Sequence, residues 1–270
     1  MAGGNIPREV EGSSAPVART HWVDSMPARS VLSVLFWGWV FLSGALLALL
    51  GLVLFLPFNP WTDPHRRVME WVNRQWGRAV YGAMPALHIE AVGLERLREG
   101  EGPYVICPNH QSVADIPLML SLLPQAKFIA KPSAFWVPPM GLQLRLAGYI
   151  PAGRGGEGEA QHALARAQGW LARGRHILVF PEGTRSPDTR VQRFGQGPFA
   201  LAAQAGVAVL PVAISGTGHA LARGAFRYRF RGHIRVEFLP PVPVTEAPRA
   251  AASQVRALIQ QALLERGVRS

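Results

Sequence analysis

The feature that most constrains the fold is an uninterrupted apolar stretch near the start of the chain. Residues 31–56, VLSVLFWGWVFLSGALLALLGLVLFL, contain no charged side chain. As a helix this stretch would be about 39 Å long, whereas the hydrocarbon core of a bilayer is about 30 Å thick. The stretch is too long, and begins too far into the chain, for a cleaved signal peptide. We therefore expect a membrane helix that either crosses the bilayer at a tilt or enters it and turns back.

A second helix is expected shortly after the apolar one. Residues 65–84 place apolar side chains on one helical face and charged side chains on the opposite face. The apolar face holds Val68, Val72, Trp76, Ala79 and Ala83, and the charged face holds Glu70, Arg74 and Arg78. A basic amphipathic helix with Trp, beside a membrane segment, is typical of the membrane interface. We expect that location, with packing on the folded domain as the alternative.

The charge of the chain is strongly basic. The formal net charge is +11, and Lys127 and Lys131 are the only lysines, so nearly all of the basic residues are arginine. Arginine binds phosphate through two parallel hydrogen bonds, so the excess fits phosphorylated substrates or an anionic membrane surface. A compositional bias of the source would look the same. More arginines follow residues 31–56 closely than precede them, which favours a cytoplasmic C-terminal part.

From residue 85 onward, short apolar runs rich in Val and Ile alternate with helical patterns. The runs lie at 86–93, 103–108, 126–131, 147–151, 175–181, 207–215 and 233–240, and the helices at 159–173, 197–205 and 246–268. Strands that alternate with helices predict an α/β fold, a layered sheet flanked by helices. We expect a disordered tail at 1–29, a membrane-associating helical segment at 30–84 and one domain at 85–270.

Polar residues follow two of these runs. The stretch NHQSVAD follows PYVICP and contains Asn109, His110 and Asp115, and FPEGTRS follows HILV at residues 180–186. A histidine at the end of a strand can serve as a general base, and a nearby aspartate can hold its ring. The second stretch places Glu182, Gly183, Thr184 and Arg185 within one turn. A guanidinium there can bind a phosphate, and the glycine lets the backbone approach a ligand.

Together these motifs resemble the blocks of the glycerolipid acyltransferase family, of the 1-acylglycerol-3-phosphate O-acyltransferase (lysophosphatidate acyltransferase) type. The first block of that family appears as Asn109, His110 and Asp115, and its Phe-Pro-Glu-Gly-Thr-Arg block is complete at 180–185. Its middle block is similar to GYIPAGR, which ends at Arg154, and its fourth block resembles VLPVAISG at 209–216. Lys131 matches a lysine between the blocks. The resemblance covers roughly residues 85–216.

The resemblance implies an O-acyltransferase that moves a fatty acyl chain from a thioester to the hydroxyl of a lysophospholipid. His110 would take the hydroxyl proton and Asp115 would hold the imidazole, so that the substrate hydroxyl replaces the serine of a Ser-His-Asp triad. The residues expected to bind substrate are Asn109, Lys131, Arg154, Glu182, Gly183, Thr184 and Arg185. No cofactor and no metal is expected. The co-substrate would be acyl-coenzyme A or acyl carrier protein.

The expected acceptor is 1-acylglycerol-3-phosphate, which gives phosphatidate in phospholipid biosynthesis. Glycerol-3-phosphate and a lyso-aminolipid such as lyso-ornithine lipid stay open as acceptors. The expected location is the inner (cytoplasmic) membrane of a bacterium, with the catalytic domain on the cytoplasmic side and membrane lipids as partners. A nucleic-acid partner is not expected, because no recognition module is present.

Two alternatives belong to other functional classes. One is a non-catalytic lipid-binding membrane protein built on the same fold. The other is a lipid hydrolase that uses Cys107 or Ser112 as its nucleophile, although the chain has no G-x-S-x-G elbow. We expect Cys107, the single cysteine, to be a buried strand residue.

Overall fold

The computed structural model describes residues 26–97, 102–123, 125–153, 156–244 and 247–265. The expected tail at 1–29 falls mostly outside these residues. Seven strands form one mixed sheet in the order β1-β7-β6-β2-β5-β3-β4. Their bounds are Leu87–Val92 (β1), Val105–Pro108 (β2), Ala126–Ala130 (β3), Ile150–Pro151 (β4), His176–Leu178 (β5), Val209–Ser215 (β6) and Gly232–Phe238 (β7). Each of the seven predicted runs contains one strand, so the α/β prediction is confirmed.

The strands from β6 to β4 are all parallel, whereas β7 is antiparallel to β6 and β1 is parallel to β7. In a parallel sheet the carboxyl ends of neighbouring strands lie at one edge. The stretches NHQSVAD and FPEGTRS follow β2 and β5, which belong to this parallel part. The topology therefore gathers the motifs at one edge of the sheet.

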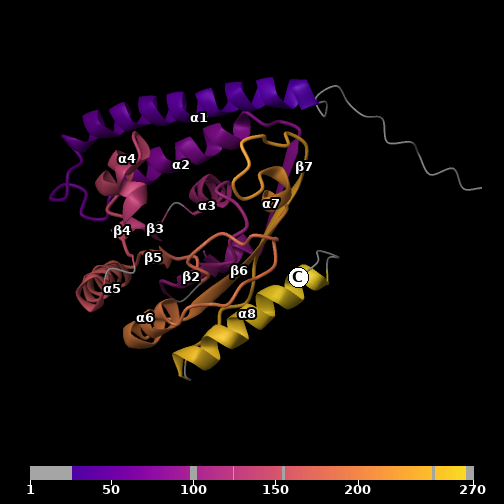
Figure 1. The fold of residues 1–270 in the computed structure, drawn as a ribbon. Helices are drawn as coiled ribbons and strands as arrows, with labels where there is room; N and C mark the ends of the chain where they lie inside the picture. Colours follow the sequence, from indigo (N-terminus) through magenta and orange to yellow (C-terminus); the bar gives the residue numbers. More distant parts are fainter. Residues whose placement is uncertain (1–25, 98–101, 124, 154–155, 245–246, 266–270) are drawn as a thin grey trace, which may run out of the picture.

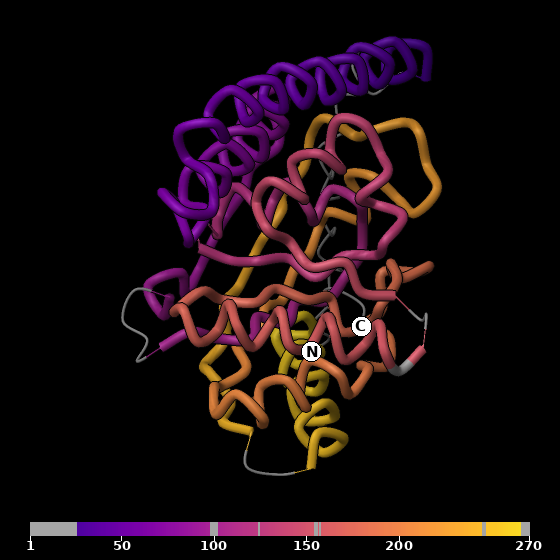
Figure 2. The backbone as a smooth tube through the Cα atoms, turned by 90° about the vertical axis from the view of Figure 1, so that its left-hand side faces the viewer, coloured from indigo at the N-terminus to yellow at the C-terminus, as the bar shows by residue number. Residues whose placement is uncertain are grey.

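Helices cover both faces of the sheet (Figures 1 and 2). One face carries α1 (Met26–Phe55), α2 (Arg67–Gly82), α3 (Asp115–Leu122) and α4 (Met140–Leu146), and the other carries α5 (Glu157–Leu171), α6 (Gly197–Ala205) and α8 (Pro248–Leu264). A short helix, α7 (Thr217–Ala220), follows β6, and the 3-10 turns η2 (Leu94–Leu97) and η3 (Pro132–Trp136) complete the elements. The sequence patterns indicated α1, α2, α5, α6 and α8 but did not predict α3, α4 and α7.

The core is divided between the two faces by the alternation of side chains along each strand. On β2, Ile106 faces the core that α1 to α4 cover, whereas Val105 and Cys107 face the core that α5, α6 and α8 cover. All three side chains are fully buried. The prediction of a buried Cys107 is confirmed, and burial raises the pKa of its thiol.

Helix α1 packs on the domain along its whole length. Near its start the ring of Phe36 lies 4.8 Å from that of Tyr228, and near its end Gln143 donates a hydrogen bond to the carbonyl of Leu47. Among the described helices α1 alone is long and apolar enough to cross a membrane. Only 17% of its most apolar 18-residue segment is buried against the rest of the protein. Its outward face exposes large apolar side chains, which include Val31, Leu35, Leu42, Leu46, Leu49 and Val53.

Helix α2 lies between α1 and α3. It packs on the folded domain, which was the alternative to the expected location at the membrane interface. Met69, Val72 and Val80 are buried. Gly77 permits the close approach to α3, because a Cβ atom there would collide with the carbonyl oxygen of Pro117. The helical pattern placed Glu70 on the charged face, but its side chain is buried as well. That part of the prediction was wrong.

Glu70 belongs to a buried charge cluster, which we define as Glu70, Lys127 and Arg175. The Lys127 ammonium lies 2.7 Å from one oxygen of Glu70, and the Arg175 guanidinium pairs with the other. Lys127 also donates to the carbonyl of Ala147 at 2.9 Å and lies over the ring of Trp170. Burial lowers the pKa of Lys127 to about 8, and Glu70 opposes this shift. The cluster joins α2 to β3 and to the residue that precedes β5.

Candidate active site

The loops after β2 and β5 meet directly at the carboxyl edge of the sheet. The backbone N–H of His110 donates to Oε1 of Glu182 at 2.9 Å. The backbone N–H of Ser186 donates to the carbonyl oxygen of His110 at 2.8 Å. Two motifs that lie about 70 residues apart in the sequence are therefore held together by hydrogen bonds on both sides of His110.

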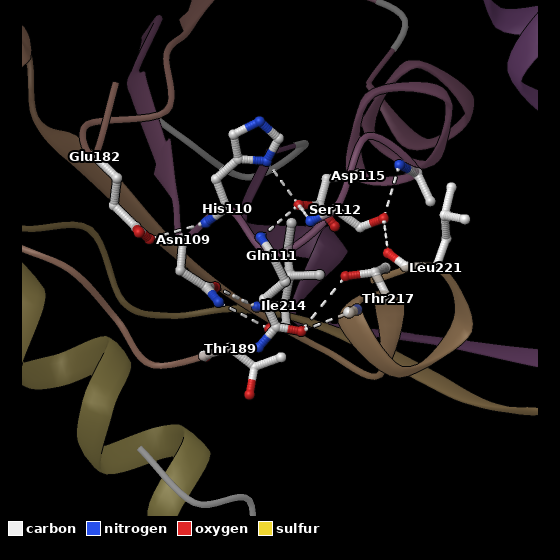
Figure 3. A network of polar contacts seen from close by, with 12 residues as sticks. Asn109, His110, Gln111, Ser112, Asp115, Glu182, Thr189, Ile214, Thr217 and Leu221 are labelled. Atoms are coloured by element: carbon white, nitrogen blue, oxygen red, sulfur yellow. Dashed lines mark hydrogen bonds and ion pairs between the residues drawn. The ribbon is translucent and has the colours of Figure 1, made fainter. Parts of the chain in front are cut away.

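His110 and Asp115 form a hydrogen-bonded pair. Nδ1 of His110 lies 2.7 Å from Oδ2 of Asp115. The other ring nitrogen, Nε2, points away from Asp115, as Figure 3 shows. The imidazole stacks on the ring of Phe180, with the ring centroids 4.0 Å apart. The side chain of His110 is 12% exposed, so the ring is held on two sides and one nitrogen is left for a ligand.

Asp115 is held as firmly as the histidine that it contacts. It begins α3, and its side chain is fully buried. Its Oδ2 atom also accepts hydrogen bonds from the backbone N–H groups of Gln111 at 2.8 Å and Ser112 at 2.9 Å. Negative charge is favourable at the start of a helix. These contacts fix the direction in which the carboxylate meets His110.

Asn109 is buried under the same loop. Its side-chain nitrogen donates to the carbonyl of Ile214 at 2.9 Å, and its side-chain oxygen accepts from the Ile214 N–H at 2.7 Å. Only 1% of Asn109 is exposed. The residue that we expected to bind substrate thus has both amide groups committed to β6, and the structure gives it the role of positioning the loop (Figure 3).

Glu182 is likewise engaged with the protein. Beyond its bond to the His110 N–H, its Oε2 atom accepts from the backbone N–H of Gln192 at 3.3 Å. Burial is the largest influence on this carboxyl group and raises its pKa to about 7, while the two hydrogen bonds oppose that shift. The expected contact of Glu182 with substrate stays a prediction.

The remaining predicted residues surround this edge. Gly183 has φ +65°, a left-handed conformation that glycine adopts without strain. Arg185 and Thr184 are partly buried, and the carbonyl of Arg185 accepts a hydrogen bond from Arg223 at 2.9 Å. Lys131 is exposed and lies immediately after β3. Arg154 lies outside the described residues.

The structure adds one residue that the sequence did not indicate. The hydroxyl of Tyr81, on α2, donates to the carbonyl oxygen of Ala114 at 2.8 Å. Ala114 directly precedes Asp115, so this bond ties the α2 layer to the start of α3. No sequence signal identified Tyr81, because it lies more than 30 residues away in the chain and its position on α2 matches neither predicted face.

Neither of the two nucleophiles considered in the sequence, Ser112 and Cys107, is available to His110. Ser112 is fully buried, and its hydroxyl donates to the carbonyl of Leu221 at 2.6 Å. Cys107 is buried in the core on the far side of β2. Both positions argue against the alternative of a serine or thiol hydrolase. Among the described residues no group of three or more His, Cys, Asp or Glu side chains has the arrangement of a metal site.

A histidine held by an aspartate at the carboxyl edge of parallel strands can act as a general base toward a hydroxyl group. A family model described as Acyltransferase matches residues 88–215. Similar proteins include the chloroplast 1-acyl-sn-glycerol-3-phosphate acyltransferase LPAT1 of Arabidopsis thaliana, at 35% identity over 71% of this chain and 53% of that protein. The Chlamydomonas reinhardtii protein of the same type is 32% identical over 81% and 68% of the two chains. That of Salmonella typhimurium is 31% identical over 62% and 69%.

A solved structure is also similar. It is described as the 1-acyl-sn-glycerophosphate (LPA) acyltransferase PlsC from Thermotoga maritima, with a TM-score of 0.74 and 26% identity over 90% of this chain and 97% of that one. The chain spans about half to two thirds of the length of the first curated relatives that it matches. It belongs to the glycerolipid acyltransferase family of the 1-acylglycerol-3-phosphate acyltransferase type. Membership in this family and the exposed apolar face of α1 associate the protein with a membrane.

Proposed function

We propose that the protein transfers a fatty acyl group from an acyl thioester to the free hydroxyl of 1-acylglycerol-3-phosphate, which gives phosphatidate for phospholipid biosynthesis. The observation that carries this proposal is the His110–Asp115 pair, whose free Nε2 has no serine or cysteine nucleophile beside it. A thioester is already activated, so transfer needs only a deprotonated alcohol. The names of the relatives support the same acceptor.

The reaction balances with the groups present. Nε2 of His110 takes the proton of the acceptor hydroxyl, and the oxygen attacks the carbonyl carbon of the thioester. The tetrahedral intermediate collapses, the C–S bond breaks, and the imidazolium returns its proton to the leaving thiolate. Asp115 holds Nδ1 throughout and stabilises the positive ring. The donor is acyl-coenzyme A or acyl carrier protein, and no bound cofactor takes part.

The acceptor phosphate is proposed to bind Arg185 and Lys131 at the same edge, and Arg154 is proposed as a third phosphate-binding residue. We expect kcat/KM for 1-acylglycerol-3-phosphate to exceed that for monoacylglycerol, which has the same chain and hydroxyl without the phosphate, by about tenfold to a hundredfold. Purified protein in detergent micelles would be assayed with labelled acyl-coenzyme A and acyl carrier protein. Glycerol-3-phosphate and lyso-ornithine lipid would be compared in parallel, because each tests a different acceptor.

Transfer to none of these acceptors by correctly folded protein would contradict the proposal and favour a non-catalytic lipid-binding role. Equal rates with and without the phosphate would retain acyl transfer but overturn the proposed acceptor site. Preference for lyso-ornithine lipid would move the function to aminolipid synthesis. The first outcome tests the reaction, and the other two test the identity of the acceptor.

For the membrane, we propose that α1 lies along the surface of one leaflet and does not cross the bilayer. Contacts with the domain occur at Phe36, Gly44 and Leu47, so a crossing helix would carry packed protein into the hydrocarbon core. An apolar helix with one face on the protein can bury its other face in the interface. We place the protein at the cytoplasmic side of a bacterial inner membrane, where acyl thioesters are available.

The position of α1 can be tested by labelling its two ends. Met26→Cys and Trp61→Cys place thiols at 57% and 90% exposed positions, while the native Cys107 is buried and serves as the unlabelled control. We expect a membrane-impermeant maleimide to label both variants in inside-out bacterial membrane vesicles and neither variant in right-side-out vesicles. Labelling of the two ends from opposite sides would show that α1 crosses the bilayer.

A further inference from the structure

A cavity of about 640 Å³ lies between the start of α1 and the segment from α7 to residue 229. The basic side chains that line it come from both parts of the chain: Arg29 from α1, His219 from α7, and Arg227 and Arg229 from the following loop. No Asp or Glu lines it. None of the residues that we expect to contact the acyl donor or the acceptor lines it either.

The arginines of this cavity have no anionic partner among the described residues. The arginines that form ion pairs in the described part of the chain are Arg175, Arg190 and Arg235, none of which lines the cavity. The Nε atom of Arg29 is buried and has no hydrogen-bond partner in the protein. The contact of Arg227 is with the thioether sulfur of Met26 at 3.5 Å, a weak acceptor. Since a buried donor without an acceptor is costly, this cavity favours a ligand with anionic oxygens.

The cavity opens beside the part of the protein that faces the membrane. Phe226, which lines it, is 54% exposed and stacks on Trp37 of α1, with the ring centroids 6.5 Å apart. The indole N–H of Trp37 donates to the carbonyl of Phe226 at 2.9 Å, which fixes the loop against α1. Figure 1 shows this loop next to the N-terminal end of α1. An exposed aromatic ring and several arginines next to an apolar helix are suited to the headgroup region of a bilayer.

The alternation of arginine and aromatic residues at 227–230 explains how the basic groups reach the cavity. Tyr228 and Phe230 pack against Phe36 of α1, with ring centroids at 4.8 and 5.7 Å. Arg227 and Arg229, between and beside them, are exposed. The segment is extended, but it pairs with no strand, because β7 begins at Gly232. The aromatic residues anchor the loop, and the arginines are free to meet a ligand.

We propose that this cavity binds the phosphate headgroup of an anionic phospholipid of the surrounding membrane, at a site separate from the acceptor site. The shared chemistry is a phosphate ester, which the nucleotide part of a coenzyme A donor also carries. The position next to α1 and Phe226 favours the lipid. Binding there would fix the start of α1 at the membrane surface and would orient the domain. The proposal concerns binding alone and does not depend on the acyl transfer reaction.

The test compares two triple variants of the full chain with the same change in net charge. R29Q/R227Q/R229Q removes the cavity arginines, and the control R173Q/R193Q/R249Q removes three exposed arginines elsewhere. Binding is measured by flotation with vesicles of phosphatidylcholine, with or without phosphatidylglycerol. We expect the cavity variant to lose about tenfold or more of its affinity for the anionic vesicles, because each arginine near an anionic surface contributes to binding. We expect the control to lose much less.

Three results would overturn the proposal. Equal losses in both triple variants would show attraction to the surface by net charge alone. Unchanged vesicle binding together with a raised KM for acyl-coenzyme A in the cavity variant would assign the cavity to the donor. Unchanged vesicle binding and unchanged KM would leave the cavity without a phosphate ligand. Acyl transfer in neutral micelles should be the same in the cavity variant and the wild type, which also confirms that the variant folds.

Discussion

Replacing His110 by alanine is expected to lower kcat for acyl transfer by about 10²- to 10⁴-fold, the usual contribution of a general base. The variant removes Nε2 but leaves the substrate contacts at the edge of the sheet, so KM for the acceptor should change little. The backbone N–H and carbonyl of His110, which bond to Glu182 and Ser186, are unaffected by the substitution. The measurement is initial rate against acceptor concentration in detergent micelles.

The matched control is His162→Ala. His162 is exposed on α5, on the face of the sheet opposite α1, and should tolerate alanine with no change in rate. A second variant, Asp115→Asn, keeps the shape of the side chain. It replaces the carboxylate, which accepts hydrogen bonds in the wild type, by a neutral amide. We expect it to lower kcat as well. Full activity of folded His110→Ala would remove the histidine from the mechanism and with it our account of the site.

The second large effect is expected for stability. Glu70→Gln removes the anion of the buried charge cluster and leaves Lys127 and Arg175 buried without a counter-ion. Breaking a buried pair in this way typically costs about 3–5 kcal/mol. We therefore expect a large decrease in the unfolding temperature. The measurement is thermal unfolding in detergent, with Glu95→Gln, an exposed position, as the control that should change the unfolding free energy by less than about 0.5 kcal/mol.

A rescue variant separates the charge effect from simple loss of packing. Changing Glu70, Lys127 and Arg175 together to methionine removes all three charges and retains much of the volume. Apolar replacement of a complete buried ion cluster is often neutral or stabilising, so this triple variant should be more stable than Glu70→Gln. If the single variant is as stable as the wild type, the cluster contributes nothing measurable and α2 is held by its apolar contacts alone.

The strands and the His110–Asp115 pair were predictable from the sequence because their signals are local. Each strand is a short run rich in Val and Ile, and His110 and Asp115 lie five positions apart on one loop. The pairing of Glu70 with Lys127 and Arg175 has no such local signal, because the three residues come from α2, β3 and the start of β5. The helical pattern placed Glu70 on the same face as Arg74 and Arg78. A charge pattern along one helix gives no information about ion pairs with residues that are distant in the sequence.

The short helices were missed for a related reason. α4 and α7 have seven and four residues, too few for a helical period to stand out against the neighbouring strands. The hydrogen bonds of Asn109 with Ile214 could not be predicted from the sequence, because Ile214 lies on a strand more than 100 residues later. Tyr81 was missed because its hydrogen bond to Ala114 joins two layers that the sequence does not show to be in contact.

The attachment of α1 along the domain has a consequence for the membranes in which the protein can work. A helix that crosses a bilayer must match its thickness, and a mismatch is relieved by tilting or by deforming the lipid. A helix that lies on one leaflet has no such length to match. In the proposed position of α1 on one leaflet, its contacts with the domain near both ends would set the height of His110 above the hydrocarbon. The position at which an acceptor headgroup meets the imidazole should therefore stay the same in thin and thick membranes.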